Sequence, residues 1–215
     1  MNSLHIMLGS PDSRQHTMPP LKEQDYYIGV DKGALLLAEN GYYIDLSLGD
    51  FDSITDAEKL IIEKNSKKVI SFEPEKDDTD AELSLVYAMQ FFDTEQIILY
   101  GWSGGRLDHL MSILMIVMQP RFKSIVTRLI FINQTNTLKF YLPGSYLLFK
   151  EPDKKYCSFI GMTPLSNLTL DKGFKYTLDN KNFDYPIALI SNEFVMEEGR
   201  FSFDSGLAAF IQSKD

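Results

Sequence analysis

Cysteine is nearly absent from this sequence. Cys157 is the one cysteine among 215 residues, so a disulfide within the chain is excluded, and the composition is typical of a reducing compartment. One cysteine and three histidines offer no zinc-binding spacing. Cys157 falls in an apolar run, where we expect a core residue rather than a nucleophile.

Positive charge and long hydrophobic runs are also scarce. The chain has 21 Lys and Arg against 30 Asp and Glu, a net charge of -9, which argues against a nucleic-acid partner. No apolar run approaches the ~18 residues that a membrane helix needs. Residues 1–9 lack the basic start and long apolar core of a signal peptide. We therefore expect a cytoplasmic protein that binds neither membranes nor nucleic acid.

What the first half does contain is a regular alternation of strand and helix patterns. Strands are expected at residues 4–8, 26–30, 44–48, 69–72 and 97–100, and helices at 32–40, 55–65, 79–92 and 107–119. Thr55 with Glu58, and Thr79 with Glu82, have the spacing of a capping box at a helix start. This rhythm predicts an α/β fold, with a mostly parallel sheet flanked by helices.

The second half shows short β-forming runs separated by turn residues. They lie at 125–132, 138–142, 146–149, 156–160, 168–170, 174–178, 187–191 and 201–203. Such spacing is typical of a sandwich or barrel. We expect a catalytic domain at 1–123 and an all-β sandwich domain at 124–215.

Short acidic segments follow four of the first-half strands. They are Asp31-Lys32-Gly33, Gly49-Asp50-Phe51-Asp52-Ser53, Lys76-Asp77-Asp78-Thr79-Asp80 and the stretch from Gly101 to His109. In open α/β sheets, ligands bind beyond the carboxyl ends of the strands. Carboxylates gathered there repel one another and need a cation, and hard oxygen ligands suit Mg²⁺ and its phosphate partners. The pattern predicts metal-assisted phosphate chemistry.

Two of these segments have competing explanations. Asp50 and Asp52 are two apart, so in an extended segment they face the same way and can hold a metal ion. The alternative is a plain turn in which Ser53 or Asp52 caps the next helix. Asp31 could likewise cap the helix that follows it.

The segment around Thr79 mixes structural and functional candidates. Thr79 is expected to cap a helix, and Asp80 in its first turn favours the helix dipole. Asp77 lies before the helix and has no such structural role. Lys76 could neutralise Asp77 or bind a phosphate as a point charge.

The glycine-rich stretch offers donors for phosphate oxygens. Gly104 and Gly105 precede a helix start, where exposed backbone N–H groups can receive an anion, and Arg106 can add a bidentate contact. Asp108 and His109 then begin the helix, where His109 could also be an ordinary helical residue. The spacing matches neither a dinucleotide-binding fingerprint nor a P-loop.

Taken in order and with their approximate spacing, these four segments resemble those of thiamine pyrophosphokinases. The resemblance is strong over residues 25–115, and Ser191-Asn192 resembles a thiamine-site motif of that family. It implies an N-terminal α/β domain that binds ATP and Mg²⁺ and a C-terminal β-sandwich that binds thiamine. It also implies a homodimer with the active site near the subunit interface, and pyrophosphate transfer from ATP to thiamine that gives AMP and thiamine diphosphate.

The resemblance suggests a role for each candidate. We expect Asp50, Asp52 and Asp80 to hold Mg²⁺, with Asp77 and Asp108 assisting and Asp80 the first candidate for the general base. Arg106 and Lys76 would stabilise charge on the transferring group. The other expected binding residues are Asp31, Thr79, Gly104, Gly105, His109, Ser191 and Asn192.

One departure and two alternatives stay open. Some family members carry a tryptophan shortly after the Ser-Asn motif, but the only tryptophan here is Trp102, so Phe194 or Phe201 could take its place. A pyrophosphokinase for another hydroxymethyl heterocycle, such as a pterin, is one alternative. A nucleotide- or thiamine-binding sensor without turnover is the other.

Overall fold

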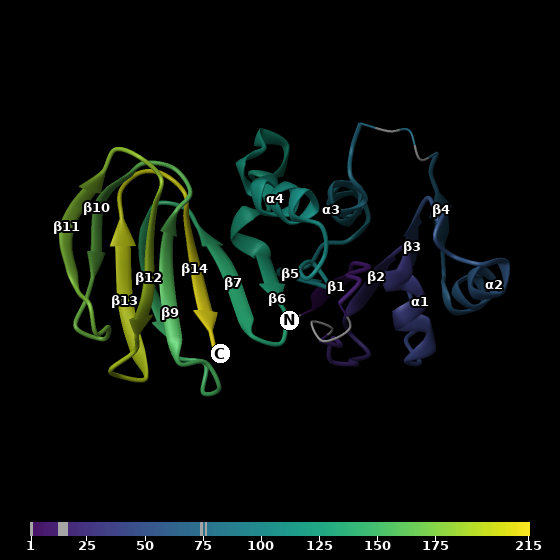
Figure 1. Cartoon of the computed structure of the whole chain (residues 1–215), viewed down its shortest axis with the longest axis horizontal. Coiled ribbons are helices and arrows are strands. Elements are labelled where there is room, and N and C mark those ends of the chain that lie inside the picture. The colour runs from purple at the N-terminus through teal and green to yellow at the C-terminus, as the bar shows by residue number, and fades with distance from the viewer. Residues whose placement is uncertain (1, 13–16, 74, 76) are drawn as a thin grey trace. The chain divides into compact units, whose positions relative to one another are not determined.

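The computed structural model describes residues 2–12, 17–73, 75 and 77–215. The chain divides into two compact units, Met1–Gln134 and Thr135–Asp215 (Figure 1). We describe each unit separately.

A parallel sheet forms the centre of the first unit. Over the described residues its six strands run in the order β6-β5-β1-β2-β3-β4, and each neighbouring pair is parallel. The strands are β1 (Ser3–Met7), β2 (Tyr26–Val30), β3 (Leu46–Gly49), β4 (Val69–Ser71), β5 (Gln96–Tyr100) and β6 (Leu129–Ile132). Most strand residues are buried on both faces, as parallel sheets require.

Helices cover this sheet. They are α1 (Lys32–Glu39), α2 (Asp56–Asn65), α3 (Asp80–Phe91) and α4 (Leu107–Met115), followed by the 3₁₀ turns η2 (Ile116–Met118), η3 (Pro120–Phe122) and η4 (Val126–Arg128). Figure 1 shows α1 and α2 on one side of the sheet and α3 and α4 on the other. The capping boxes at Thr55 and Thr79 are both present, so these two helix starts are confirmed.

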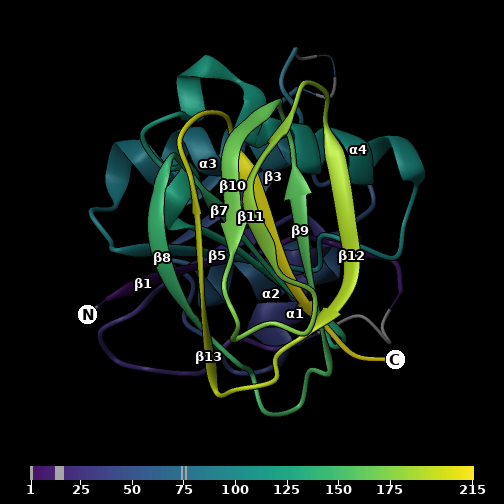
Figure 2. The same cartoon turned by 90° about the vertical axis from the view of Figure 1, so that its left-hand side faces the viewer.

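The second unit is built only of antiparallel strands in its described residues. One sheet has the order β12-β9-β14-β7 and the other β11-β10-β13-β8, and Figure 1 and Figure 2 show them as two layers. The strands are β7 (Asn136–Tyr141), β8 (Gly144–Phe149), β9 (Tyr156–Gly161), β10 (Leu165–Leu170), β11 (Leu178–Phe183), β12 (Ile187–Glu193), β13 (Glu198–Phe203) and β14 (Ala208–Ser213).

Aromatic side chains fill the space between these two layers. Phe159, Phe174, Phe201 and Phe210 are buried in one cluster, and Phe201 lies on the buried face of β13, where buried and exposed residues alternate. Their rings meet edge-on or tilted at centroid distances of 5.1–5.4 Å around Phe159. The predicted fold class, an α/β part followed by an all-β part, is confirmed.

Some expected elements differ in the structure. Residues 126–128 form η4 rather than the start of a strand, and in place of a strand at 174–177 there is an isolated bridge from Phe174 to Phe194 followed by a bend before β11. Helix α4 ends at Met115, short of the expected 119, and continues as η2. The first compact unit, Met1–Gln134, includes β6, which pairs with β5 in the first sheet.

None of the helices over the described ranges combines the length and the apolar character needed to cross a membrane.

Candidate active site

A cavity of about 400 Å³ opens at the carboxyl ends of the strands in the first unit. Five segments line it: the stretch from Leu8 to Pro11 after β1, Val30 to Lys32 at the end of β2, Ser53 after β3, Thr79 to Ala81 at the start of α3, and the stretch from Gly101 into α4. Each of the four acidic segments predicted from the sequence therefore contributes residues to one pocket.

The predicted site residues fall into four groups. Those that line the cavity are Asp31, Thr79, Asp80, Gly105, Arg106 and His109. Those in the same segments but outside the lining are Asp50, Asp52, Asp77, Gly104 and Asp108. Ser191 and Asn192 belong to the second unit, and Lys76 lies outside the described residues.

Asp31 lies at a strained turn between β2 and α1. Its backbone has φ 47° and ψ -120°, a conformation that costs a non-glycine residue about 1–3 kcal/mol. Its side chain makes no cap for α1; instead Oδ1 accepts a hydrogen bond from Phe51 N at 3.2 Å. Gly49 makes room for this contact, since a Cβ there would lie 1.8 Å from Oδ1. The possibility that Asp31 is simply a helix cap is therefore wrong.

The Gly49–Ser53 segment is a turn, not an extended strand. Phe51 has φ 55° and its ring is buried in the core of the first unit, while Asp50 is half-buried and Asp52 exposed. Asp52 N donates to Asp50 Oδ1 at 3.1 Å, which closes the turn. We expected Asp50 and Asp52 to face the same way because side chains alternate sides in an extended segment. That argument does not apply here, because the positive φ of Phe51 breaks the extended conformation.

The glycine-rich turn after β5 is held from several sides. Gly101 has φ 64°, and a Cβ there would lie 2.2 Å from Leu8 O, so only glycine fits between the two loops. Ser103 O accepts from Ser10 Oγ, Ser103 Oγ accepts from Asn133 Nδ2 at 2.8 Å, and Trp102 Nε1 donates to Ile132 O at 3.1 Å. Trp102 thus anchors the turn to the end of β6.

Arg106, which lines the cavity, pairs with Asp108, which does not. Arg106 Nε donates to Asp108 Oδ1 at 3.1 Å and Nη2 donates to Oδ2. Both side chains are more than half exposed. The hydrogen bonds and charge of Arg106 lower the pKa of Asp108, and those of Asp108 raise the pKa of Arg106. Arg106 is therefore a fixed cation whose exposed head a negatively charged ligand can reach.

A metal ion is implied by the carboxylates, and the donor set can be tested for it. Over the described residues, no three side chains of His, Cys, Asp or Glu come together to form a ready metal site. Mg²⁺ does not need one, since it commonly takes one or two carboxylates and fills its shell with water and substrate phosphates. The hard oxygen atoms of Asp50, Asp52 and Asp80 fit that chemistry.

In the second unit, Asn192 serves the backbone around it. Its Oδ1 accepts from Tyr176 N at 2.9 Å, and its Nδ2 donates to Tyr176 O at 2.8 Å. Ser191 is exposed at a register shift in β12, with φ 59°. Phe194 and Phe201 are buried in the core of the unit, so the idea that either could stack on a ligand is wrong. The exposed ring beside this motif is that of Tyr176.

Comparison with known proteins bears on both units. The family model described as "Thiamin pyrophosphokinase, catalytic domain" matches residues 19–129, and "Thiamin pyrophosphokinase, vitamin B1 binding domain" matches residues 146–208. A curated protein named thiamine pyrophosphokinase, from Bacillus subtilis (strain 168), is 35% identical over 221 residues and covers 100% of both chains. The chain belongs to the thiamin pyrophosphokinase family.

Solved structures of thiamin pyrophosphokinases have the same fold. A thiamin pyrophosphokinase family protein from Enterococcus faecalis is 38% identical, covers 100% of both chains and superposes with a TM-score of 0.91. The thiamine pyrophosphokinase from Bacillus subtilis is 33% identical, with a TM-score of 0.84 over 99% of each chain. The recognition made from the four acidic segments is thereby confirmed.

Sequence reasoning missed several pocket residues of this thiamin pyrophosphokinase family member. Ser10 and Pro11 follow β1, Ser103 lies within the glycine-rich turn, and Ser112 lies on α4. The loop after β1 could have been found by the rule used for the other segments, because it too leaves the carboxyl end of a parallel strand. It was overlooked because it carries no cluster of charges.

Proposed function

We propose that this protein transfers the pyrophosphoryl group of ATP to the hydroxyl of thiamine, giving thiamine diphosphate and AMP. One observation carries the proposal: four segments far apart in the chain, each predicted from the sequence, contribute to a single pocket at the carboxyl ends of the strands. Membership of the thiamin pyrophosphokinase family supports it further, as does the name of the Bacillus subtilis relative.

Cationic and N–H donor groups at the pocket suit a polyphosphate. Lys32 lies at the first position of α1 and Arg106 at the N-cap of α4, so each combines a side-chain cation with the positive end of a helix dipole. We assign Lys32, Arg106 and the backbone of Gly104 and Gly105 to the phosphates of ATP. Lys76 is proposed for the same role from the sequence alone.

The reaction needs alignment and charge neutralisation rather than a covalent enzyme intermediate. The thiamine hydroxyl oxygen attacks the β-phosphorus, the bond from that phosphorus to the α–β bridging oxygen breaks, and AMP leaves with that oxygen. Arg106 would neutralise charge that develops on the transferring group. His109, in the first turn of α4, also lines the pocket, and we propose that it contacts the nucleotide.

Asp50, Asp52 and Asp80 are the residues that we propose hold Mg²⁺. When bound, the ion would neutralise phosphate charge and help to fix the orientation of ATP. Asp77 and Asp108 would assist at the edge of the site. Among the carboxylates predicted to be catalytic, Asp80 is the one that lines the cavity, so we assign it to orient the thiamine hydroxyl and accept its proton.

The second unit would supply the thiamine side. Thiamine carries a cationic thiazolium, which favours an aromatic and acidic environment. The exposed ring of Tyr176, whose backbone N–H and C=O both bond to the side chain of Asn192, and the exposed residue Ser191 are our candidates for that contact. Tyr176 thus takes the place of Phe194 and Phe201 as the proposed aromatic partner of thiamine.

We also propose a homodimer in the cytoplasm, with the active site near the subunit interface. Exposed apolar side chains on the second unit, including Ile190, Val195 and Met196, support an interface there. A cytoplasmic location agrees with the single, buried thiol of Cys157.

One assay tests the function. The protein is incubated with ATP and Mg²⁺ and offered thiamine or a hydroxymethyl pterin, and AMP and the diphosphate product are measured. We expect AMP and thiamine diphosphate in equal amounts, dependent on both Mg²⁺ and thiamine. Turnover with the pterin but not with thiamine would show that the substrate is a pterin. If neither compound yields AMP, the protein binds its ligands without turnover and is not an enzyme.

A further inference from the structure

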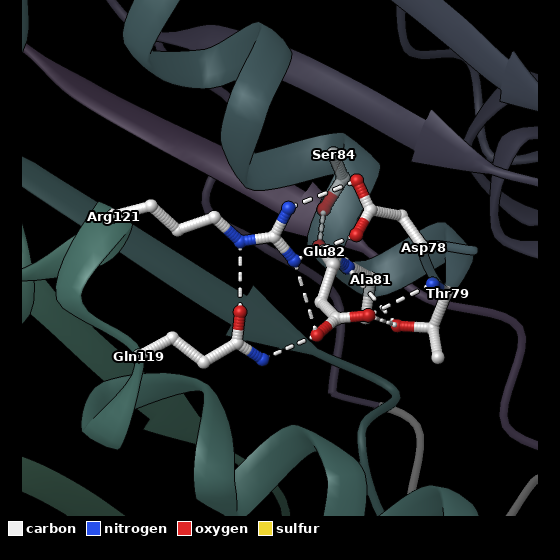
Figure 3. Close-up of polar contacts among 7 residues, drawn as sticks. All are labelled: Asp78, Thr79, Ala81, Glu82, Ser84, Gln119 and Arg121. Atoms are coloured by element: carbon white, nitrogen blue, oxygen red, sulfur yellow. Dashed lines mark hydrogen bonds and ion pairs between the residues drawn. The ribbon is translucent and has the colours of Figure 1, made fainter.

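Figure 3 shows a polar network that joins the start of α3 to the segment after α4. Its centre is the guanidinium of Arg121. Nη1 donates to Asp78 Oδ2 at 2.9 Å and Nη2 to Asp78 Oδ1 at 2.7 Å, a bidentate pair between residues 43 positions apart. This geometry fixes both the distance and the orientation of the two groups.

A second contact reaches the first turn of α3. Arg121 Nη2 lies 3.3 Å from Glu82 Oε1, and Gln119 Nε2 donates to the same oxygen. The other oxygen of Glu82 is used by the capping box, where it accepts from Thr79 N at 2.8 Å and from Thr79 Oγ1 at 2.9 Å. Glu82 thus links Arg121 to the backbone at Thr79.

The guanidinium of Arg121 is also held by residues next to it in the chain. Arg121 Nε donates to Gln119 Oε1 at 2.7 Å, and the guanidinium lies 4.7 Å from the ring centroid of Phe122, which is fully buried. Pro120 between Gln119 and Arg121 restricts the backbone at the start of η3. Arg121 is therefore held from its own side before it contacts Asp78 and Glu82.

The residues between the two anchors are those of the pocket. Asp78 precedes Thr79 and Asp80, Glu82 follows them, and both Thr79 and Asp80 line the cavity. We propose that Arg121 is a positioning residue for the active site: it holds Asp78 and Glu82 so that Thr79 and Asp80 keep their places at the pocket wall. The inference rests on the proposed function for its catalytic consequence, but not for its structural one.

Electrostatics agrees with this role. Residues 77–82 include four carboxylates, those of Asp77, Asp78, Asp80 and Glu82, and they repel one another. The hydrogen bonds and charge of Arg121 lower the pKa of Asp78. Burial works to raise the pKa of Glu82, but the hydrogen bonds from Gln119 and Thr79 outweigh it and the pKa is lowered. Arg121 therefore places a positive charge in direct contact with Asp78 and Glu82, which offsets part of that repulsion.

The network is suited to positioning more than to overall stability. The side chains of Arg121 and Asp78 are 38% and 29% exposed, and ion pairs this open to water contribute little to the free energy of folding. Arg121→Gln should consequently fold. Small displacements of catalytic groups, in contrast, can lower a rate by about 10²-fold.

The test compares Arg121→Gln and Arg121→Lys with the matched control Lys123→Gln, which removes an exposed cation two residues further on. Three quantities are measured: amide hydrogen exchange over residues 77–83, affinity for a non-hydrolysable ATP analogue with Mg²⁺, and kcat and KM for ATP at a temperature well below Tm. We expect Arg121→Gln to speed exchange in 77–83 and to lower kcat/KM by about 10- to 100-fold. The control should behave as wild type.

Arg121→Lys separates geometry from charge. Lysine keeps the charge but cannot make the bidentate contact, so it should restore little of the lost activity. Asp78→Asn should reproduce the loss, and the double variant should be no worse than either single one.

Wild-type exchange over 77–83 in Arg121→Gln, or a fall in Tm with unchanged kcat/KM and analogue affinity, would overturn the proposal. Full rescue by lysine would also overturn it. If the wild type makes no thiamine diphosphate, the proposed function fails, while exchange and analogue binding still decide the role of Arg121.

Discussion

At the scale of single residues, side-chain contacts stabilise strained backbone conformations next to the pocket. Asp31 and Phe51 both have positive φ, and they meet in one hydrogen bond from Phe51 N to Asp31 Oδ1. Such conformations persist only where the surroundings enforce them. Here the buried ring of Phe51 and the close approach of Gly49 do so. The hydrogen bond from Phe51 N keeps the Asp50–Phe51–Asp52 turn against the pocket residue Asp31.

The metal assignment can be tested at Asp52. Asp52→Asn removes a carboxylate that we propose binds Mg²⁺, while its exposed side chain carries little of the fold. We expect AMP formation from ATP and thiamine to fall by about 10²-fold or more, with an unchanged circular dichroism spectrum. Asp56→Asn, an exposed acidic residue at the start of α2, should keep full activity. Full activity of Asp52→Asn would exclude this residue from the metal site.

Asn192 gives a second prediction at the residue scale. Asn192→Ala leaves both Tyr176 N and Tyr176 O without their side-chain partner, and Asn192 is only 4% exposed. We expect a loss of about 1–3 kcal/mol in the free energy of unfolding, measured in urea. Ser191→Ala, exposed and next to it, should cost far less. Equal stability of the two variants would contradict the structural role of Asn192.

At the scale of elements, two helices begin with the same device but only one borders the pocket. Thr55 and Thr79 are both capping-box residues, at α2 and α3. Thr55→Ala and Thr79→Ala should each lower the free energy of unfolding by about 1 kcal/mol. Only Thr79→Ala should also lower kcat/KM, since Thr79 lines the cavity. Equal activities would show that Thr79 acts as a helix cap alone.

The elements that could be predicted from the sequence are those with local signals. Each capping box is a motif of four residues that identifies a helix start by itself. Strand β2 is a short apolar run that ends at a charged turn. Strand β11 was missed because its sequence, LDNKNF, is polar and mostly exposed. A strand that buries little apolar surface has no periodic pattern to detect.

The candidate site shows the same division. The rule for strand ends located four of the five segments that line the pocket, because it depends only on topology. The direction of Asp50 and Asp52 could not be predicted, since it depends on the positive φ of Phe51. The contact between Arg121 and Asp78 joins residues 43 apart, and no local pattern signals it.

At the scale of the whole molecule, the response to pH depends on a buried polar group in the first unit. His5 Nε2 lies 3.0 Å from Asp25 Oδ2, and Nδ1 lies 3.1 Å from Tyr100 Oη, while the ring stacks on Tyr27. A neutral imidazole satisfies both contacts if Nε2–H donates to Asp25 and Nδ1 accepts from Tyr100. Protonation would turn Nδ1 into a donor and oblige Tyr100 to rotate its hydroxyl hydrogen away.

The pKa shifts of this pair set the sign of the effect. Burial lowers the pKa of His5 below 6.5 and outweighs the hydrogen bond and charge of Asp25. Burial works to raise the pKa of Asp25 from 3.8, but the hydrogen bonds from His5 and Ser3 outweigh it and the pKa is lowered. In both cases the unfolded chain binds protons more readily than the folded one, so stability increases with pH across each transition.

We therefore expect the free energy of unfolding to be greatest above pH 6.5, to fall as His5 titrates below that value, and to fall again below pH 3.8 as Asp25 takes a proton. The first step is worth about 1.4 kcal/mol for each unit by which the fold lowers the pKa of His5. Urea unfolding at pH 8, 6 and 5 measures it. His5→Gln should reduce the slope between pH 8 and 5, whereas His109→Gln, at an exposed position on α4, should retain it. If His5→Gln leaves the slope of the free energy of unfolding against pH unchanged, His5 is not the source of the pH dependence, because that variant removes its imidazole.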